Sequence, residues 1–134
     1  MIVVDANVLV PFLVPGPETA ESEAVFTKDP DWAGSALLRN ELRNVLAVHV
    51  RLNKLSLEDA LAAAAEFEEV FGENTIDVRS DTVLKLSVQS GCTAYDCEYV
   101  ALAEVLRVPL VTHDKAILKA FPEIAVRPAQ FLKA

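Results

Sequence analysis

Four carboxylates occupy positions that their neighbours in the sequence mark as buried. Asp5 and Asp114 each follow a short apolar run that is typical of an interior strand. Glu41 and Asp96 interrupt apolar stripes at helical spacing. An ionised carboxylate is strongly disfavoured away from water unless a positive charge compensates it, and no lysine or arginine lies on the same predicted stripes. We therefore expect the four side chains to converge in one pocket and to bind a divalent cation.

Each acid also has a purely structural interpretation. Asp5 and Asp114 could simply cap helices that begin directly after them. Asp96 falls at the third position of a predicted helix, where it would complement the positive end of the helix dipole. The functional interpretation gains weight because open α/β sheets bind ligands at the carboxyl ends of their strands, where Asp5 and Asp114 are expected.

Glu41 is the hardest of the four acids to explain by structure alone. A solvated helix would place it among polar residues, but its neighbours at helical spacing are apolar. These neighbours are Leu37, Leu38, Val45, Val48 and Leu52, whereas Arg39, Asn40, Arg43, Asn44 and Arg51 occupy the other side. The alternative is a glutamate at the edge of the stripe that reaches out to water.

Several other residues are weaker candidates for a site. Asn7 and Thr112 could orient the carboxylates by hydrogen bonds, or could belong only to turns. His49 and His113 are interpreted as core-edge and loop residues, because hard cations prefer oxygen ligands. Tyr95 and Tyr99 are interpreted as core residues rather than substrate contacts. Arg39, Arg43 and Arg51 could hold phosphate groups of a ligand, or could form an ordinary solvated helix face.

Composition limits the class of protein. The chain has 134 residues, 52% of them hydrophobic, and a net charge of −8, which argues against coating nucleic acid by bulk electrostatics but not against a nuclease. Cys92 and Cys97 have neither a redox nor a zinc spacing and are expected to be buried thiols. We expect one domain over residues 1–134, without a leader or a membrane-spanning segment, in the cytoplasm.

The pattern of elements predicts an α/β fold. Short apolar runs at residues 2–4, about 74–78, 109–112 and 124–126 alternate with longer stretches of helical period, and a small strand is expected at Trp32-Ala33. This alternation indicates a central, mostly parallel sheet of four to five strands with helices on both faces. The expected helices follow Asp5, run from Pro17 to about Thr27, from a Ser35 cap to about Arg51, from Ser56 to Gly72, from Ser80 to Gly91, from a Thr93 cap, and over residues 115–120.

Four stretches, taken together and in order, resemble the PIN-domain ribonucleases, and most closely the VapC-like toxins of prokaryotic toxin–antitoxin pairs. They cover the chain from one end to the other, and the ordered set is more specific than any one of them. The stretches are residues 2–9, Asn40-Glu41-Leu42, residues 95–103 and residues 109–114.

This resemblance implies a function and a set of site residues. Asp5, Glu41, Asp96 and Asp114 would form the acidic quartet that holds one or two Mg²⁺ or Mn²⁺ ions, with Asn7 and Thr112 in support. The implied reaction is hydrolysis of RNA phosphodiester bonds by an activated water, leaving a 5′-phosphate and a 3′-hydroxyl. The implied partners are a VapB-like antitoxin and a second copy of the chain in a homodimer.

Two alternatives from other classes stay open. The chain could be a PIN-like binding or scaffold protein whose metal site is structural or idle, which metal-stimulated cleavage of RNA would exclude. A phospho-acceptor receiver domain also carries acids at strand ends, but this sequence lacks a paired Asp-Asp near the start and the strand-end lysine of such domains.

Overall fold

The structure is a computed structural model that describes residues 1–134. Its centre is a sheet of five parallel strands in the order β3-β2-β1-β4-β5. The strands are β1 (Ile2–Val4), β2 (Trp32–Ser35), β3 (Thr75–Ile76), β4 (Leu110–Val111) and β5 (Ala125–Val126). The α/β architecture expected from the sequence is therefore confirmed, and every predicted strand is present.

Eight α-helices and one short 3₁₀ helix connect and cover the strands. They are α1 (Ala6–Leu13), α2 (Thr19–Lys28), α3 (Leu37–Arg51), α4 (Leu57–Phe71), η1 (Gly72–Asn74), α5 (Ser80–Ser90), α6 (Ala94–Leu106), α7 (Lys115–Ala120) and α8 (Pro128–Lys133). Helix–strand alternation of this kind gives parallel pairing. Each helix carries the chain back to the edge of the sheet where the previous strand began, so the next strand runs in the same direction.

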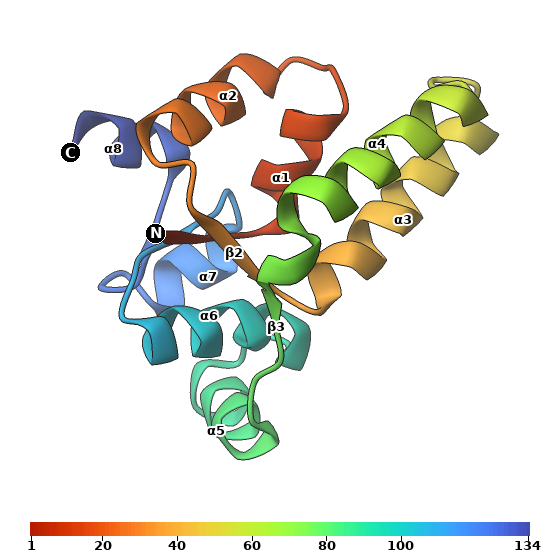
Figure 1. The fold of residues 1–134 in the computed structure, drawn as a ribbon. Coiled ribbons are helices and arrows are strands. Elements are labelled where there is room, and N and C mark those ends of the chain that lie inside the picture. Colours follow the sequence, from red (N-terminus) through yellow and green to blue (C-terminus); the bar gives the residue numbers. More distant parts are fainter.

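Helices lie on both sides of the sheet (Figure 1). Helix α6 packs across β1, β2 and β4, and α5 packs against α6. On the other side, α1, α2 and α4 bury an aromatic cluster against β2, in which the Trp32 and Phe71 rings stack with centroids 5.7 Å apart. Phe12 and Phe26 complete this cluster. Helices α3 and α4 form a hairpin that extends away from the sheet (Figure 1).

Three helix starts differ from those predicted. Helix α2 begins at Thr19 rather than Pro17, and Glu18 is its N-cap residue. Ser35 ends β2 instead of capping α3, because Ala36 intervenes, although the Ser35 hydroxyl still accepts a hydrogen bond from the Leu37 N–H at 3.2 Å. Ser80 is already helical, with Arg79 at the N-cap.

The other predicted helix ends are confirmed by their local geometry. The side chains of Ser56 and Thr93 accept hydrogen bonds from N–H groups in the first turns of α4 and α6. Gly91 ends α5 with φ +78°, a left-handed conformation that suits glycine.

The C-terminal helix α8 was not predicted, and Lys28 of α2 donates hydrogen bonds to its last carbonyls. No helix is both long and apolar enough to span a membrane.

An acidic cluster at the carboxyl edge of the sheet

The four acids come from two strand ends and two helix starts. Asp5 directly follows β1, and Asp114 lies three residues beyond the end of β4, which is the neighbour of β1 in the sheet. Glu41 lies in the second turn of α3, after β2, and Asp96 in the first turn of α6. Because parallel strands end at the same edge of a sheet, this topology brings residues from the two ends of the chain together.

Asp5 is held in place by side chains rather than acting as a cap. It is buried, with 7% of its surface exposed, and it makes no side-chain capping bond to α1. Its Oδ2 accepts hydrogen bonds from the Thr112 hydroxyl at 2.8 Å and from the Asn7 amide at 3.3 Å. Asp5 therefore occupies the N-cap position of α1, but its side chain does not make the capping hydrogen bond that the structural interpretation invokes.

Asn7 and Thr112 join the strand ends into one network. The Asn7 amide also donates to the Thr112 hydroxyl at 3.4 Å, and its oxygen accepts the His113 N–H at 3.1 Å. The Thr112 hydroxyl accepts the Asp114 N–H at 3.0 Å. Both residues therefore fix the distance between the β1 and β4 ends, as the supporting role predicted for them requires.

Asp114 and Asp96 have structural roles as well. The Asp114 carboxylate caps α7 by accepting the Ile117 N–H at 2.9 Å through Oδ1. Asp96 lies in the first turn of α6, where its N–H donates to the Thr93 hydroxyl at 3.1 Å. The capping bond uses one oxygen of Asp114, so its other oxygen is not engaged by the cap.

Glu41 faces α6 across the edge of the sheet. Its Oε1 accepts a hydrogen bond from the Tyr99 hydroxyl at 3.2 Å, and Tyr99 is itself only 2% exposed. The fully buried line of α3 is Leu38, Leu42 and Leu46, so Glu41 lies beside that line rather than within it, in a half-buried position. Sequence reasoning missed the contact with Tyr99, which looks like any other core tyrosine on the buried side of α6.

The acids influence one another electrostatically. Burial and the negative charges of Asp5 and Asp96 raise the pKa of Glu41 to about 6, against the opposing effect of the Tyr99 hydrogen bond. Burial raises the pKa of Asp5 and of Asp96, and in both cases the charge of Asp114 adds to the effect. The four carboxylates therefore form one coupled cluster, called here the acidic cluster.

No cationic side chain compensates this cluster. The ion pairs of the chain involve Asp29, Glu68, Asp81 and Glu21, and none includes a member of the acidic cluster. Uncompensated carboxylates that raise one another's pKa oppose folding, and strongly perturbed carboxyls of this kind mark a candidate functional site.

Comparison with known proteins identifies the family. The sequence pattern of the PIN domain matches residues 2–124, which is most of the chain. The chain belongs to the PIN domain family. The resemblance found in the sequence motifs is thereby confirmed.

Individual relatives of this PIN domain span nearly its whole length. Ribonuclease VapC3 from Pyrobaculum aerophilum is 29% identical over 127 residues, which cover 92% of this chain and 96% of the relative. The crystal structure of PAE2754 from the same organism superposes with a TM-score of 0.77 at 24% identity, over 98% of this chain and 93% of that one.

Two solved structures from bacteria share the fold at lower identity. FitAcB from Neisseria gonorrhoeae superposes with a TM-score of 0.72 at 19% identity, covering 96% of this chain and 99% of that chain. A toxin–antitoxin complex from Klebsiella pneumoniae gives a TM-score of 0.66 at 19% identity, with 96% and 98% covered. At these identities the likeness establishes the PIN fold.

The acidic cluster of this PIN domain offers the donor chemistry of a divalent cation site. All four side chains are carboxylates, and hard cations such as Mg²⁺ and Mn²⁺ prefer oxygen. No three His, Cys, Asp or Glu side chains are close enough together to hold an ion as they stand. The residues fit the ion by charge and donor type, because burial and mutual repulsion are what a bound cation would offset.

The remaining candidate residues lie away from the acids or have other partners. Arg39 forms a bidentate ion pair with Glu68 of α4, whereas Arg43 and Arg51 are exposed. The His113 Nε2 atom lies 3.4 Å from the Glu21 carboxylate of α2 but makes no hydrogen bond. Cys92 and Cys97 are buried free thiols, as predicted.

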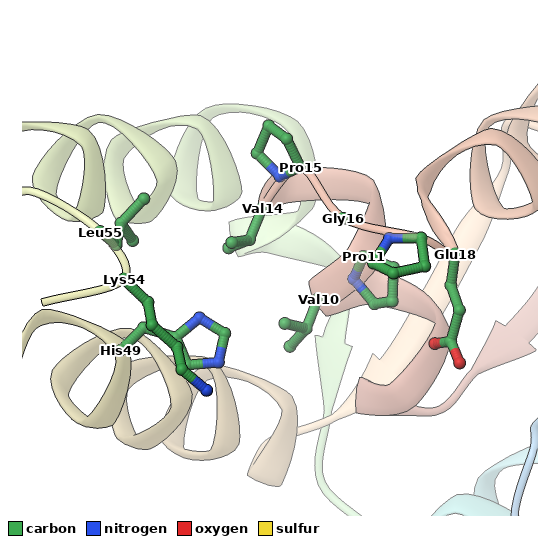
Figure 2. Close-up of a pocket in the computed structure, with 10 residues that line it drawn as sticks. Val10, Pro11, Val14, Pro15, Gly16, Glu18, His49, Lys54 and Leu55 are labelled. Atoms are coloured by element: carbon green, nitrogen blue, oxygen red, sulfur yellow. The ribbon is translucent and has the colours of Figure 1, made fainter. Parts of the chain in front are cut away.

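A separate hollow of about 360 Å³ contains no member of the acidic cluster. Figure 2 shows that its lining comes from α1, from the turn that follows α1, and from the end of α3 with the connection to α4. His49 and Lys54 contribute to it. His49 is thus a partly buried residue outside the acidic cluster, in agreement with its interpretation as a core-edge residue.

Proposed function

We propose that this PIN domain is a metal-dependent ribonuclease of the VapC-like toxin kind. The observation that carries the proposal is the acidic cluster: four carboxylates at the carboxyl edge of the sheet, coupled to one another and without a cationic partner. The similarity to Ribonuclease VapC3 supports RNA as the substrate. The reaction is hydrolysis of a phosphodiester bond to a 5′-phosphate and a 3′-hydroxyl.

The four acids take different parts in the proposed reaction. Asp5 and Asp96 are the principal ligands of Mg²⁺ or Mn²⁺, Asp114 serves a second ion or its water, and Glu41 acts through water or as general base. A divalent cation bound there supplies the positive charge that activates water and stabilises the leaving oxygen. A general base works best when its pKa lies near the operating pH. In the metal-free protein, burial and the neighbouring acids raise the pKa of Glu41 to about 6.

The other residues position these groups. Asn7 and Thr112 hold the Asp5 carboxylate and the Asp114 backbone in register through the network at the β1 and β4 ends. Arg43 and Arg51 are the proposed contacts to RNA phosphates. Arg39 was proposed for the same role, but its guanidinium is already engaged by Glu68 and by the Gly72 carbonyl.

The proposed partners follow from the relatives. One solved neighbour is a toxin–antitoxin complex, which supports a VapB-like antitoxin as a regulator of this chain. An antitoxin of this kind would place an arginine or lysine against the acidic cluster, where a positive charge is missing. A homodimer is proposed as the assembled state.

The experiment is cleavage of a panel of structured RNAs with Mg²⁺ or Mn²⁺, with EDTA, and with the variants Asp5→Asn and Asp96→Asn. The proposal predicts metal-dependent cleavage that both variants abolish while they stay folded by circular dichroism. Cleavage that persists in both variants and is still blocked by EDTA would place the metal elsewhere. A folded wild-type protein that binds Mn²⁺ but cleaves no RNA would favour the second candidate, a PIN-like scaffold whose metal site is structural or idle.

A further inference from the structure

Two tyrosines on the same helix have opposite environments. Tyr99 is buried and bonded to Glu41, whereas Tyr95, one turn earlier on α6, is 67% exposed. The sequence predicted both as core residues, and for Tyr95 this is wrong. Single exposed apolar side chains are common on this chain, and what distinguishes Tyr95 is the hollow that it lines beside Glu41.

Tyr95 lines a hollow of about 650 Å³ between the beginning of α6 and the first turns of α3. This hollow, called here the Tyr95 hollow, is lined by Leu37, Asn40, Glu41, Asn44, Val45 and Tyr95. Glu41 belongs both to this lining and to the acidic cluster. The Tyr95 hollow therefore adjoins the place where the proposed chemistry occurs.

The lining has the chemistry of a nucleobase site. An exposed aromatic ring offers a stacking surface to any base. Asn40 and Asn44 are exposed, and their side chains make no hydrogen bond within the chain, so each presents a free amide donor and acceptor of the kind that reads base edges. Leu37 and Val45 supply apolar walls.

Charge excludes the phosphate backbone from the Tyr95 hollow. Its lining includes no lysine or arginine, and its only charged member is the Glu41 carboxylate. A phosphate would be repelled there, while a neutral base would not. The electrostatics therefore separate the two parts of a nucleotide, with the phosphate at the cation-binding acidic cluster and the base in the Tyr95 hollow.

We propose that the Tyr95 hollow binds an unpaired nucleobase of the RNA next to the scissile phosphate, an inference that rests on the proposed ribonuclease function. Tyr95 stacks on the base, and Asn40 and Asn44 contact its edge. Because a paired base is stacked on its neighbours and cannot enter, this site selects single-stranded loops and ends over duplex RNA.

The test uses short single-stranded RNAs that carry 2-aminopurine at successive positions, with Mg²⁺ and the non-cleaving background Asp5→Asn. Stacking quenches 2-aminopurine fluorescence, so one position should be quenched on binding. In this background Tyr95→Ala should remove the quenching and weaken binding roughly 5- to 150-fold, the factor that corresponds to loss of one stacked base. Tyr95→Phe keeps the ring and should behave like the background.

The matched control is Val105→Ala, which changes a residue of the same helix with a similar exposure, 69%, outside the Tyr95 hollow. It should bind and quench like the background. Equal binding and quenching by Tyr95→Ala, or no quenching at any position, would overturn the inference. So would a Tyr95→Ala variant that binds RNA normally but loses affinity for a protein partner, because the surface would then be a protein interface.

A cleavage measurement separates this inference from the proposed function. Wild-type protein should cut a substrate with an abasic nucleotide at the quenched position more slowly than the intact RNA, whereas Tyr95→Ala should barely distinguish the two. If the wild type cuts no RNA while quenching still depends on Tyr95, the ribonuclease proposal fails and the nucleobase site stands. If the wild type cuts RNA and Tyr95→Ala cuts both substrates at wild-type rates, only the nucleobase site fails.

Discussion

Helix α3 carries charged residues on two sides, and the surroundings of these charges differ. One side provides an opposite charge, and the other does not. Toward α4, Arg39 pairs with Glu68, lies over the Phe67 ring at 5.5 Å, and holds the pKa of the Glu68 carboxyl below its usual value. Toward α6, two residues further along, Glu41 meets a tyrosine and other acids, and its pKa is raised to about 6.

The difference separates structural charge from functional charge. Arg39 and Glu68 compensate each other's charge, and their ion pair connects α3 to α4 within the hairpin. Glu41 belongs to a cluster that no part of the chain neutralises, and such a cluster costs stability unless a cation binds. Variants on the two sides should therefore change different properties of the protein.

The largest loss of RNA cleavage is expected from substitution of Asp5, at the end of β1, or of Asp96, in α6. Asp5→Asn or Asp96→Asn removes a proposed metal ligand and should lower metal-dependent RNA cleavage at least about 1000-fold, since cation stabilisation of the transition state contributes several kcal/mol. The initial rate of cleavage of a labelled RNA in Mn²⁺ measures this. Glu68→Gln, which neutralises an acid on the other side of α3, should cleave at the wild-type rate, and an equal loss there would erase the distinction between the two sides.

Glu41→Gln should lower cleavage by about 100-fold or more while making the metal-free protein more stable. The raised pKa of Glu41 means that the folded protein binds its proton more tightly than the unfolded chain does. The contribution of the Glu41 proton to the free energy of unfolding in EDTA is therefore fully present below about pH 4.5 and is lost as pH rises through about 6. The raised pKa values of Asp5 and Asp96 act in the same direction.

Thermal unfolding in EDTA across this pH range measures the effect of Glu41→Gln. The melting temperature of Glu41→Gln should decline less steeply with pH than that of the wild type. Addition of Mg²⁺ at neutral pH should raise the melting temperature of the wild-type protein again. Glu68→Gln should instead lose a small amount of stability above the pKa of Glu68, because it breaks an ion pair. A wild-type melting temperature that rises through pH 6 in EDTA would contradict the account of the acidic cluster.

Tyr99→Phe should have an intermediate effect by loosening Glu41. The Tyr99 hydroxyl favours the ionised form of Glu41, so its removal should raise the pKa of Glu41 further. The acidic limb of the pH–rate profile should move to higher pH, with a loss of about 3- to 10-fold near neutrality, in line with removal of one hydrogen bond to a charged group. Tyr95→Phe, one turn away, should leave the limb in place, and identical profiles for both variants would show that the Tyr99 hydroxyl does not act on Glu41.

The smallest effect concerns the arginines. Arg43→Ala or Arg51→Ala should weaken RNA binding a few-fold and reduce the slope of log affinity against log salt by about 0.7 per lost phosphate contact. Binding at several salt concentrations measures this slope. Arg39→Ala should reduce stability through Glu68 and leave the slope unchanged, whereas a changed slope would return Arg39 to the RNA-contact set.

Part of the arrangement of the four acids could be predicted from the sequence because it depends on local patterns, whereas their shared cation site stays a prediction. An acid directly after an apolar run reports a strand end, and parallel strands end at a common edge, so Asp5 and Asp114 could be brought together without coordinates. Glu41 was selected because it was predicted to lie within the buried stripe of its helix, and this premise is partly wrong. The apolar residues Leu37 and Val45 beside it are half-buried, while the fully buried line runs one position further along the helix.

Other features left no local signal. The bond from Tyr99 to Glu41 depends on how α3 and α6 approach each other, and the exposure of Tyr95 depends on the same packing. The end of α6 could not be predicted because Arg107, not a glycine, takes the left-handed conformation there, with φ 58°. Helix α8 is short, and its contact with Lys28 joins residues about a hundred positions apart.

The most direct test of the central claim is Mn²⁺ binding, followed by the electron paramagnetic resonance signal of free ion at neutral pH in the absence of RNA. The account predicts saturable binding to the wild type and to Glu68→Gln, and loss of that binding in Asp5→Asn. Binding of equal strength in Asp5→Asn, or no saturable binding by the folded wild type, would contradict it.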